Sequence, residues 1–322
     1  MKPTFIVVGA QKAGTDSLYG YLDDHPAVVM ADPKEPHYFS KVPAAVDRAA
    51  YQRSFAARPR ARVFGEASTS YMPVRWTAER IRNEAGPDVR LVFVLRNPVE
   101  RIYSAFLNMK RARPLRDARD FATAVPWQAG TLADILREEG VRLGDAVRRR
   151  RVDLGPFRDF GDEIDWNYRY VRNSVYRPQI DRFLRCFPRE QCLFLTTDDL
   201  RTDWRGAAAA LYRFLDVDAG WVARLAVPQR NRASLPRPGA IGRLLSYRAF
   251  RDLVRPALLN RGGDRVKTWL KRIATTTEYS PLADEPRARL VEAFAEENGA
   301  LSDVIGRDLS SWNVSARAES GR

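Results

Sequence analysis

The sequence predicts an α/β fold with a central parallel sheet flanked by helices, and two observations carry this expectation. Apolar runs at residues 4–8 and 91–95 are each followed closely by a segment whose apolar residues recur with helical spacing. In addition, the stretch GAQKAGTDSL, residues 9–18, places a glycine-containing turn between the first run and its helix. Repeated strand–loop–helix order of this kind is typical of parallel sheets with crossover helices.

Strand and helix patterns alternate through the first 110 residues. Apolar content predicts buried strands at residues 4–8, 28–30 and 91–95, and a strand end followed by a turn at 63–67. Helices are predicted at residues 15–24, 45–60 and 74–86, and in the segment that carries Ile102, Phe106 and Met109 on one face. The stretch ADPKEPHYF, after the second strand, is expected to be a loop.

The second half of the chain is expected to add an insertion to this sheet. Residues 112–165 contain an arginine run and several Gly and Pro breaks, which indicate a helical insertion over the sheet. Further patterns predict a helix from residue 176, a strand at 191–196, a helix around Leu211 and Leu215, a basic helical segment at 245–275 and a last amphipathic helix at 286–305. We therefore expect one domain over residues 1–314 and a disordered tail at 315–322.

Composition narrows the functional classes. The chain has 322 residues, of which 45% are hydrophobic, so it is long enough to bury a large core. Its net charge of +14 attracts polyanions, anionic membranes or phosphorylated small molecules, although solvated Arg-rich helices explain the charge equally well. There are only two histidines, His25 and His37, which strongly disfavours a His-based metal cluster.

Three further features bear on the compartment. The cysteines, Cys186 and Cys192, lack metal-ligand spacing and are expected to be reduced thiols. The N-terminal apolar run is short and leads into the glycine loop, so it indicates a buried strand rather than a signal peptide. No run of about 18 apolar residues is present. These features predict a soluble, cytoplasmic protein.

The glycine loop has the features of an anion site. A strand that ends at Gly9 and a helix that begins near Thr15 direct backbone N–H groups at one point, and the helix dipole adds positive charge. Lys12 lies inside the loop, whereas the triphosphate-binding loop has its lysine after the second glycine. The apolar strand at 91–95 is followed by Arg96, not by an acidic metal ligand. We therefore expect a multiply charged anion that is bound without a metal.

Arg96 and Ser104 are candidates for a second anion contact. Arg96 follows the strand directly, and strand ends line the ligand crevice of parallel sheets. A guanidinium can bind phosphate through two hydrogen bonds, and Ser104 lies about two helical turns further on. Taken alone, each is better explained structurally, Arg96 as an ordinary arginine at a helix N-terminus and Ser104 as a surface serine.

Together, the two segments carry a family resemblance. GAQKAGTDSL resembles the 5′-phosphosulfate loop of sulfotransferases that use 3′-phosphoadenosine 5′-phosphosulfate (PAPS), and LRNPVERIYSAF resembles their 3′-phosphate motif. Further similar blocks are HPAVVMADPKEPHYF, GEASTSYMP, FPREQCLFLTTDDL and IGRDLSSW. The pattern is most like that of heparan-sulfate-type Golgi sulfotransferase domains and their bacterial relatives. It implies a P-loop-like central parallel sheet with a helical insertion over the active site.

The resemblance also implies where the donor binds. The phosphosulfate would contact the loop through Lys12, Ala13, Gly14, Thr15, Asp16 and Ser17. The 3′-phosphate would contact Arg96 and Ser104, and a later basic loop with Arg232 and Arg237 would close over the nucleotide. PAPS would be the co-substrate, adenosine 3′,5′-bisphosphate (PAP) the product, and no metal would take part.

The implied catalytic residues are Lys12, Glu35 and His37. Lys12 would neutralise the charge that builds on the bridging oxygen, and Glu35 in the block PKEPHYF would accept the proton of the acceptor. His37 would orient the acceptor or share the proton, because side chains two residues apart in an extended loop project to the same side. Some relatives have a lysine after the glutamate of the block GEASTSY, whereas this chain has Ala67. Glu66, Ser70 and Tyr71 of that block are expected to support the site.

The acceptor is not specified by these motifs. We expect transfer to a hydroxyl, less readily to an amine, of a small-molecule, lipid or glycan acceptor. The insertion should shape the acceptor pocket, with Trp127, Trp166 and Tyr168 as stacking or core residues. The basic segment 245–275 makes peripheral membrane contact an open alternative. A Mg²⁺-dependent P-loop kinase of small molecules is the alternative function, specific nucleic-acid binding is not expected, and the oligomeric state is open.

Overall fold

The central element of the fold is a five-stranded parallel sheet. The structure is a computed structural model, and it describes residues 2–56, 58–112, 116–225, 235–236, 275–276 and 281–314. The strands of this sheet are β1 (Phe5–Gly9), β2 (Val28–Met30), β3 (Val63–Ala67), β4 (Arg90–Leu95) and β5 (Cys192–Thr196). Their order is β2-β3-β1-β4-β5, and each neighbouring pair is parallel. The predicted fold class is confirmed, and residues 63–67 form a complete strand of the sheet.

The middle strands are apolar because both of their faces are covered. All five residues of β1 are buried, as are residues 91–95 of β4. A parallel sheet that carries helices on both faces requires such unbroken apolar strands. Gly65 pairs with Phe5 in the sheet, and a Cβ at position 65 would lie 2.0 Å from the Phe5 ring. Close packing of β3 on β1 therefore requires glycine at this position.

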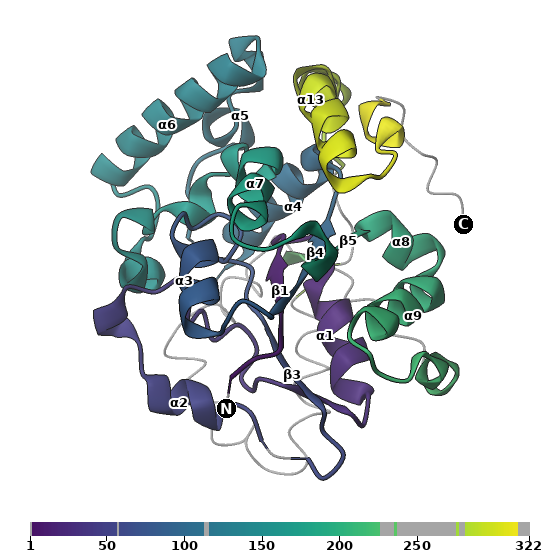
Figure 1. Cartoon of the computed structure of the whole chain (residues 1–322). Coiled ribbons are helices and arrows are strands. Elements are labelled where there is room, and N and C mark those ends of the chain that lie inside the picture. Colours follow the sequence, from purple (N-terminus) through teal and green to yellow (C-terminus); the bar gives the residue numbers. More distant parts are fainter. Residues whose placement is uncertain are drawn as a thin grey trace.

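Helices surround the sheet (Figure 1). The α-helices of the sheet region are α1 (Thr15–Asp24), α2 (Arg48–Arg53), α3 (Thr77–Glu84), α4 (Pro98–Arg111), α7 (Arg177–Leu184), α8 (Thr197–Thr202) and α9 (Trp204–Phe214). Figure 1 shows α1, α8 and α9 on one side of the strands and α3 and α7 on the other. The predicted helix over 45–60 is shorter than expected, because Asp47 caps its start through the Ala50 N–H and only residues 48–53 are α-helical.

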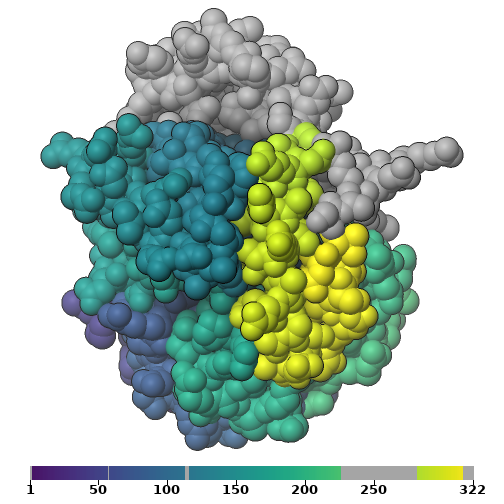
Figure 2. Space-filling model, turned by 90° about the horizontal axis from the view of Figure 1, so that it is seen from above, coloured from purple at the N-terminus to yellow at the C-terminus, as the bar shows by residue number. Residues whose placement is uncertain are grey.

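A second core lies between α4, the insertion and the last helix. The insertion contains α5 (Phe121–Ala124), α6 (Leu132–Arg148) and a 3₁₀ segment, Gly155–Glu163, and the last helix is α13 (Asp284–Ile305). Their buried apolar residues form one cluster with Ile102 and Phe106 of α4. In the view of Figure 2, the yellow C-terminal residues lie between the teal insertion and the green chain around residue 200. The insertion is thus packed against the helix that follows β4.

The remaining elements are short. The 3₁₀ helices are Pro43–Ala45, Trp127–Ala129, Trp166–Tyr168, Arg172–Ser174, Arg189–Gln191, Ala219–Arg224 and Ser310–Asn313. Strands β6 (Leu235–Pro236) and β7 (Thr275–Thr276) pair antiparallel. Several predicted features lie outside the described residues: Arg232, Arg237, most of the segment 245–275 and the tail 315–322. No helix among the described ranges is both long enough and apolar enough to cross a bilayer.

Candidate active site

The loop after β1 has the geometry of an anion site. α1 begins at Thr15, and the N–H groups in the first turn of a helix have no acceptor within the helix. Gly14 precedes it with a φ of 110°, and a Cβ there would lie 2.8 Å from Leu200 Cδ1. Only glycine satisfies both requirements without strain. The loop therefore presents free N–H groups and the positive end of a helix dipole at the carboxyl end of the sheet.

Lys12 lies in this loop and is largely buried. Its Nζ donates to Asn108 Oδ1 at 3.4 Å, which places the ammonium next to α4. Burial lowers the pKa of Lys12, Asp16 raises it, and Arg111 and Arg96 lower it further. Because the ammonium is desolvated and has no carboxylate hydrogen-bonded to it among the described residues, its charge is available to a ligand.

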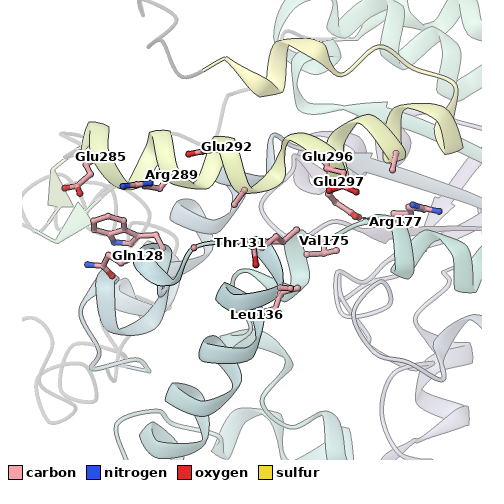
Figure 3. Close-up of a pocket in the computed structure, with 16 residues that line it drawn as sticks. Gln128, Thr131, Leu136, Val175, Arg177, Glu285, Arg289, Glu292, Glu296 and Glu297 are labelled. Carbon is pink, nitrogen blue, oxygen red and sulfur yellow. Dashed lines mark hydrogen bonds between the residues drawn. The ribbon is translucent and has the colours of Figure 1, made fainter.

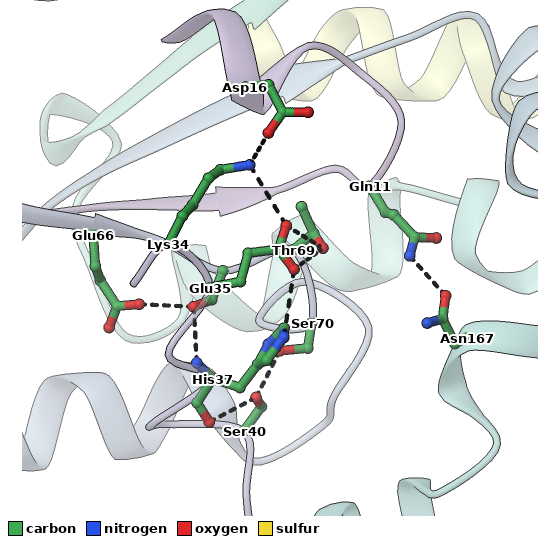
Figure 4. Close-up of polar contacts among 11 residues, drawn as sticks. Gln11, Asp16, Lys34, Glu35, His37, Ser40, Glu66, Thr69, Ser70 and Asn167 are labelled. Carbon is green, nitrogen blue, oxygen red and sulfur yellow. Dashed lines mark hydrogen bonds and ion pairs between the residues drawn. The ribbon is translucent and has the colours of Figure 1, made fainter. Parts of the chain in front are cut away.

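The other predicted donor residues of the loop differ in what they offer. The N–H groups of Ala13 and Ser17 already bond to the carbonyls of Ala10 and Gly14. Thr15 is buried in the first turn of α1, whereas the Asp16 side chain is exposed and ion-paired with Lys34. Figure 4 shows this Asp16–Lys34 pair directly above Glu35. The open donors of the loop are thus those of its helical start rather than those of Ala13.

Arg96 joins the end of β4 to the loop. Its Nη1 donates to the carbonyl of Lys12 at 3.2 Å, and its Nη2 lies 3.5 Å from Glu100 Oε2. Glu100 also accepts from Arg287 of α13 at 2.5 Å. Ser104 follows Glu100 by one turn on the same face of α4 and is buried. The structure thus brings Arg96 to the loop and leaves a carboxylate between two arginines beside Ser104.

Glu35 and His37 form a close pair. His37 Nε2 lies 3.4 Å from Glu35 Oε2, and Thr69 Oγ1 donates to the same carboxylate at 3.2 Å. Their side chains meet, as the sequence suggested, but the loop is not extended. Both residues have positive φ, 59° for Glu35 and 56° for His37. Lys12, with a φ of 69°, shares this sparsely populated backbone region, which non-glycine residues adopt only when surrounding contacts impose it.

The segment after β3 imposes this conformation (Figure 4). Glu35 N donates to the Ala67 carbonyl at 3.1 Å, and His37 N donates to Ser68 Oγ at 3.1 Å. Ser70 Oγ lies 2.7 Å from His37 Nδ1. The block GEASTSY therefore holds both backbone and side chains of the Glu35 loop in place, which explains how that loop tolerates two residues with positive φ.

Burial shifts the ionisation of both members of the pair. It raises the pKa of Glu35, while Lys34 and the Thr69 hydroxyl act in the opposite direction. It lowers the pKa of His37 to about 4, with smaller contributions from Lys41 and Lys34. His37 is therefore a neutral imidazole near pH 7, so its 3.4 Å contact with Glu35 is not an ion pair of two charged groups.

Glu66 supports the Glu35–His37 pair through hydrogen bonds. It is fully buried and accepts hydrogen bonds of 2.7 Å from each of Tyr51, Tyr71 and Ser68. Burial raises its pKa to about 7, against these three donors, and the charge of Glu35 adds to the rise. Because Ser68 also accepts from His37 N, one hydroxyl links the buried carboxylate to the loop that carries Glu35 and His37. The predicted supporting roles of Glu66, Ser70 and Tyr71 agree with these contacts.

A cavity of about 330 Å³ brings the loop and the pair together. Lys12, Gly14, Thr15 and Asp16 line it with Glu35 and His37. The sequence did not single out the other residues that line it: Gln11, Thr69, Asn108, Met109, Arg116, Phe157 and Asn167, with Trp166 as the one expected aromatic. Asn108 follows Ser104 by four residues, and this helical spacing is the one signal that pointed to it.

The insertion contributes to this cavity as expected, but not through all three predicted aromatics. Trp166 lines the cavity, and its indole ring centroid lies 6.4 Å from that of His37. Tyr168 is fully buried in the second core and donates to the Asp153 carbonyl. Trp127 lines a different cavity. Thus the wall beside His37 is built from the 3₁₀ segments of residues 155–168.

That second cavity, of about 840 Å³, lies between α13 and the start of α6 (Figure 3). Its wall carries Glu285, Glu292, Glu296 and Glu297, and none of the predicted donor or catalytic residues lines it. A glutamate-rich wall repels a phosphosulfate. The smaller cavity, which contains the anion loop, is therefore the candidate active site.

Comparisons with known proteins agree with this geometry. The sulfotransferase domain family matches residues 2–227, more than half of the chain. A sulfotransferase from Alicyclobacillus acidocaldarius has the same fold, with a TM-score of 0.64, 23% identity and coverage of 98% of this chain and 100% of that one.

Two curated relatives are also similar in sequence. Human heparan sulfate glucosamine 3-O-sulfotransferase 6 is 29% identical over 220 residues, 66% of this chain and 52% of that protein. The membrane-associated sulfotransferase kil1 of Dictyostelium discoideum is 23% identical over 268 residues, 67% of this chain and 56% of that protein. The chain thus spans about half the length of these relatives. On the family match and the shared fold, the chain belongs to the sulfotransferase domain family.

Proposed function

We propose that this protein transfers a sulfuryl group from PAPS to a hydroxyl group of an acceptor, by in-line displacement and without a metal. The observation that carries the proposal is the single cavity that unites the anion loop around Lys12 with the Glu35–His37 pair. A cation next to a general base in one cavity is the arrangement that sulfuryl transfer to an alcohol requires.

The donor spans two strand ends. Its phosphosulfate lies at the start of α1, where Lys12 and the N–H groups of Gly14 and Thr15 meet the negative charge. Its 3′-phosphate lies beside Arg96 and Ser104. Arg96 already contacts the Lys12 backbone, so the residues that bind the two ends of the nucleotide are in direct contact.

In the reaction, the acceptor oxygen attacks sulfur as the bond from sulfur to the bridging phosphate oxygen breaks. The electron pair of that bond stays on the bridging oxygen, and the Lys12 ammonium stabilises the resulting charge. Glu35 accepts the hydroxyl proton, and adenosine 3′,5′-bisphosphate departs. The raised pKa of Glu35 makes it a stronger base than an exposed glutamate, which favours the proton transfer.

His37 orients the base rather than titrating. Nδ1 of the ring lies 2.7 Å from the Ser70 hydroxyl, and Nε2 lies 3.4 Å from Glu35 Oε2. The other oxygen of Glu35, Oε1, faces Lys34 and Thr69. We propose His37 as a positioning residue on these contacts.

A sugar hydroxyl is the acceptor that the relatives favour, because several are named heparan sulfate glucosamine sulfotransferases. Small-molecule and lipid hydroxyls remain within the proposal. Ala67 occupies the position at which some of those relatives have a lysine, so the acceptor contacts differ from theirs.

Thermal shift tests the donor directly. We expect adenosine 3′,5′-bisphosphate to raise the Tm without added metal, and Mg²⁺-ATP to raise it less. Equal or greater stabilisation by Mg²⁺-ATP would favour the kinase alternative. An acceptor screen with isotope-labelled PAPS and mass-spectrometric detection of sulfated products then tests the transfer itself.

A further inference from the structure

The acceptor side of the cavity is built by α4 and the insertion. Met109, Phe157 and Trp166 form its apolar wall, and Arg116 and Asn167 add polar groups. None of these residues belongs to the loop or to the catalytic pair. They therefore face the part of the cavity that the donor does not need.

Arg116 stands out because no carboxylate of the described residues pairs with it. Its guanidinium carbon lies 5.6 Å from the centre of the Phe157 ring, a cation–π contact. Within the described ranges, no ion pair joins Arg116 to an acid, whereas Arg169 nearby pairs with Glu163 and Asp165. Stacking on a ring holds the guanidinium plane in place and leaves its edge N–H donors for a ligand.

The neighbouring polar groups also offer donors. Asn167 Oδ1 accepts from Gln11 Nε2 at 2.6 Å, which leaves the amide nitrogen of Asn167 as a donor. The Trp166 side chain is 2% exposed, and its indole N–H has no acceptor in the described part of the chain. This nitrogen has almost no accessible surface, so it is not counted among the groups open to a ligand. The acceptor side thus combines one cation, Arg116, with the neutral amide of Asn167.

The carboxylates of the cavity do not compete for these donors. Asp16 is ion-paired with Lys34, and Glu35 is held by His37 and Thr69. An ionised Glu35 would repel an acidic acceptor unless a cation faced the acid group of the acceptor. In the proposed arrangement, Arg116 is a cation of this cavity that does not contact the donor.

We propose, on the basis of the proposed function, that the acceptor carries an acid group near its reacting hydroxyl and that Arg116 binds this group. A carboxylate is an acceptor-only group that a guanidinium binds through two hydrogen bonds. The volume of about 330 Å³ is at the lower end of ligand pockets and must also hold the sulfuryl group. The acceptor is therefore a ring-sized hydroxylated acid or the acidic ring at the end of a larger molecule.

Matched pairs of probes test this assignment. The pairs are 4-hydroxybenzoate against 4-hydroxybenzamide, and glucuronate against glucose, each titrated calorimetrically into the full chain with saturating adenosine 3′,5′-bisphosphate so that no turnover occurs. In at least one pair, the acid should bind the wild-type protein at least about tenfold more tightly than its neutral partner, since a charge-assisted pair is lost in the latter. The pair that responds distinguishes an aromatic acid from a sugar acid.

Two arginine variants then separate Arg116 from the general basic charge. Arg116→Gln should bring the acid and its neutral partner to equal affinity, and Arg116→Lys should retain part of the preference. Arg158→Gln is the matched control, because Arg158 follows Phe157 directly but is exposed and donates only to the Gly155 carbonyl. It should bind like the wild type.

The outcomes separate this inference from the proposed function. Equal binding of acid and neutral probes, no binding of either in the presence of bound bisphosphate, or a preference that survives Arg116→Gln each overturns the role of Arg116. If Arg116→Gln does not fold, a preference that is reduced in Arg116→Lys supports the role, and a preference equal to that of the wild type counts against it. Failure of the bisphosphate itself to bind the wild-type protein would instead refute the proposed donor.

Discussion

His37 links Glu35 to Ser70 through its two ring nitrogens, at 3.4 Å from the Glu35 carboxylate and 2.7 Å from the Ser70 hydroxyl. Ser70 Oγ in turn lies 2.6 Å from Ser40 Oγ. The chain of hydroxyls fixes the ring, and the ring fixes the carboxylate. A base that must meet a hydroxyl in line with the sulfur–oxygen bond benefits from this constraint, since small displacements of a catalytic group cost rate.

Removing the charge of the base should abolish turnover but spare the donor. Glu35→Gln is nearly isosteric, and loss of a general base costs about 10²–10⁴-fold in rate. We expect kcat to fall by that factor while the Kd for adenosine 3′,5′-bisphosphate is unchanged. Glu79→Gln, an exposed substitution on α3, serves as the control. Full activity of Glu35→Gln in a labelled-PAPS assay would remove it from the base role.

Removing the charge of Lys12 should act on the transition state. The ammonium is buried in the cavity and hydrogen-bonded only to the Asn108 amide among the described side chains. Lys12→Met keeps the length of the side chain without its charge, and loss of such an electrostatic contact costs about 10²–10³-fold in kcat. Binding of the bisphosphate product should weaken much less. A Kd that rises as steeply as kcat falls would assign Lys12 to ground-state binding instead.

Arg96 and Glu100 should have opposite effects on the donor. Arg96→Ala should weaken the binding of adenosine 3′,5′-bisphosphate by about 10- to 100-fold, the range of a charge-assisted contact. It should weaken the binding of adenosine 5′-monophosphate far less. Glu100→Gln should strengthen the binding of the bisphosphate, because the Glu100 carboxylate lies 3.5 Å from the Arg96 guanidinium that is proposed to bind the 3′-phosphate. Calorimetry with both nucleotides measures this; equal losses for the two nucleotides in Arg96→Ala would contradict the assignment.

Histidine burial predicts a loss of stability in acid. The pKa of His37 falls from 6.5 to about 4 on folding, because the ring is buried and faces Lys41 and Lys34. Between these values the unfolded chain binds more protons than the folded one, so stability decreases as pH falls from 6.5 to about 4. His37→Asn should flatten this part of the Tm-against-pH curve. An unchanged curve in the variant would show that the ring is not buried in its neutral form.

The buried Glu66 predicts the opposite dependence of folding stability on pH. Its pKa rises from 4.5 to about 7 on folding, because the carboxyl is fully buried among Tyr51, Tyr71 and Ser68. The folded chain therefore binds more protons over this range, and the contribution of Glu66 to stability is lost as pH rises from 4.5 to about 7. In Glu66→Gln that loss should disappear. Denaturant unfolding at pH 4.5 and pH 8 measures the difference between variant and wild type.

The sheet and the donor loop could be predicted because they depend on local sequence. Residues 5–8 and 91–95 are unbroken apolar runs, and only strands covered on both faces have this pattern. The spacing of Gly9, Lys12 and Gly14 requires no knowledge of the rest of the fold. The shared cavity followed from the rule that the carboxyl ends of parallel strands meet at one edge.

The acceptor side could not be predicted in this way. Arg116, Phe157 and Asn167 lie far apart from Lys12 in sequence, and the insertion that carries Arg116 and Phe157 and ends just before Asn167 has no clear period. Their proximity to Lys12 depends on how the second core packs against α4, which is a non-local property. Likewise, the positive φ of Glu35 and His37 follows from hydrogen bonds to the block at residues 66–70, not from the identity of either residue.

In the proposed arrangement of the donor, the hydrogen bond from Arg96 to the Lys12 carbonyl fixes the separation between the groups that bind the two ends of the nucleotide. A molecule with anionic groups at both ends must match the fixed gap between the tip of β4 and the start of α1. A nucleotide whose anionic groups are separated by a different distance contacts one of the two cations and not the other. On this proposal, discrimination against other adenine nucleotides depends on the separation of their anionic groups as much as on their charge.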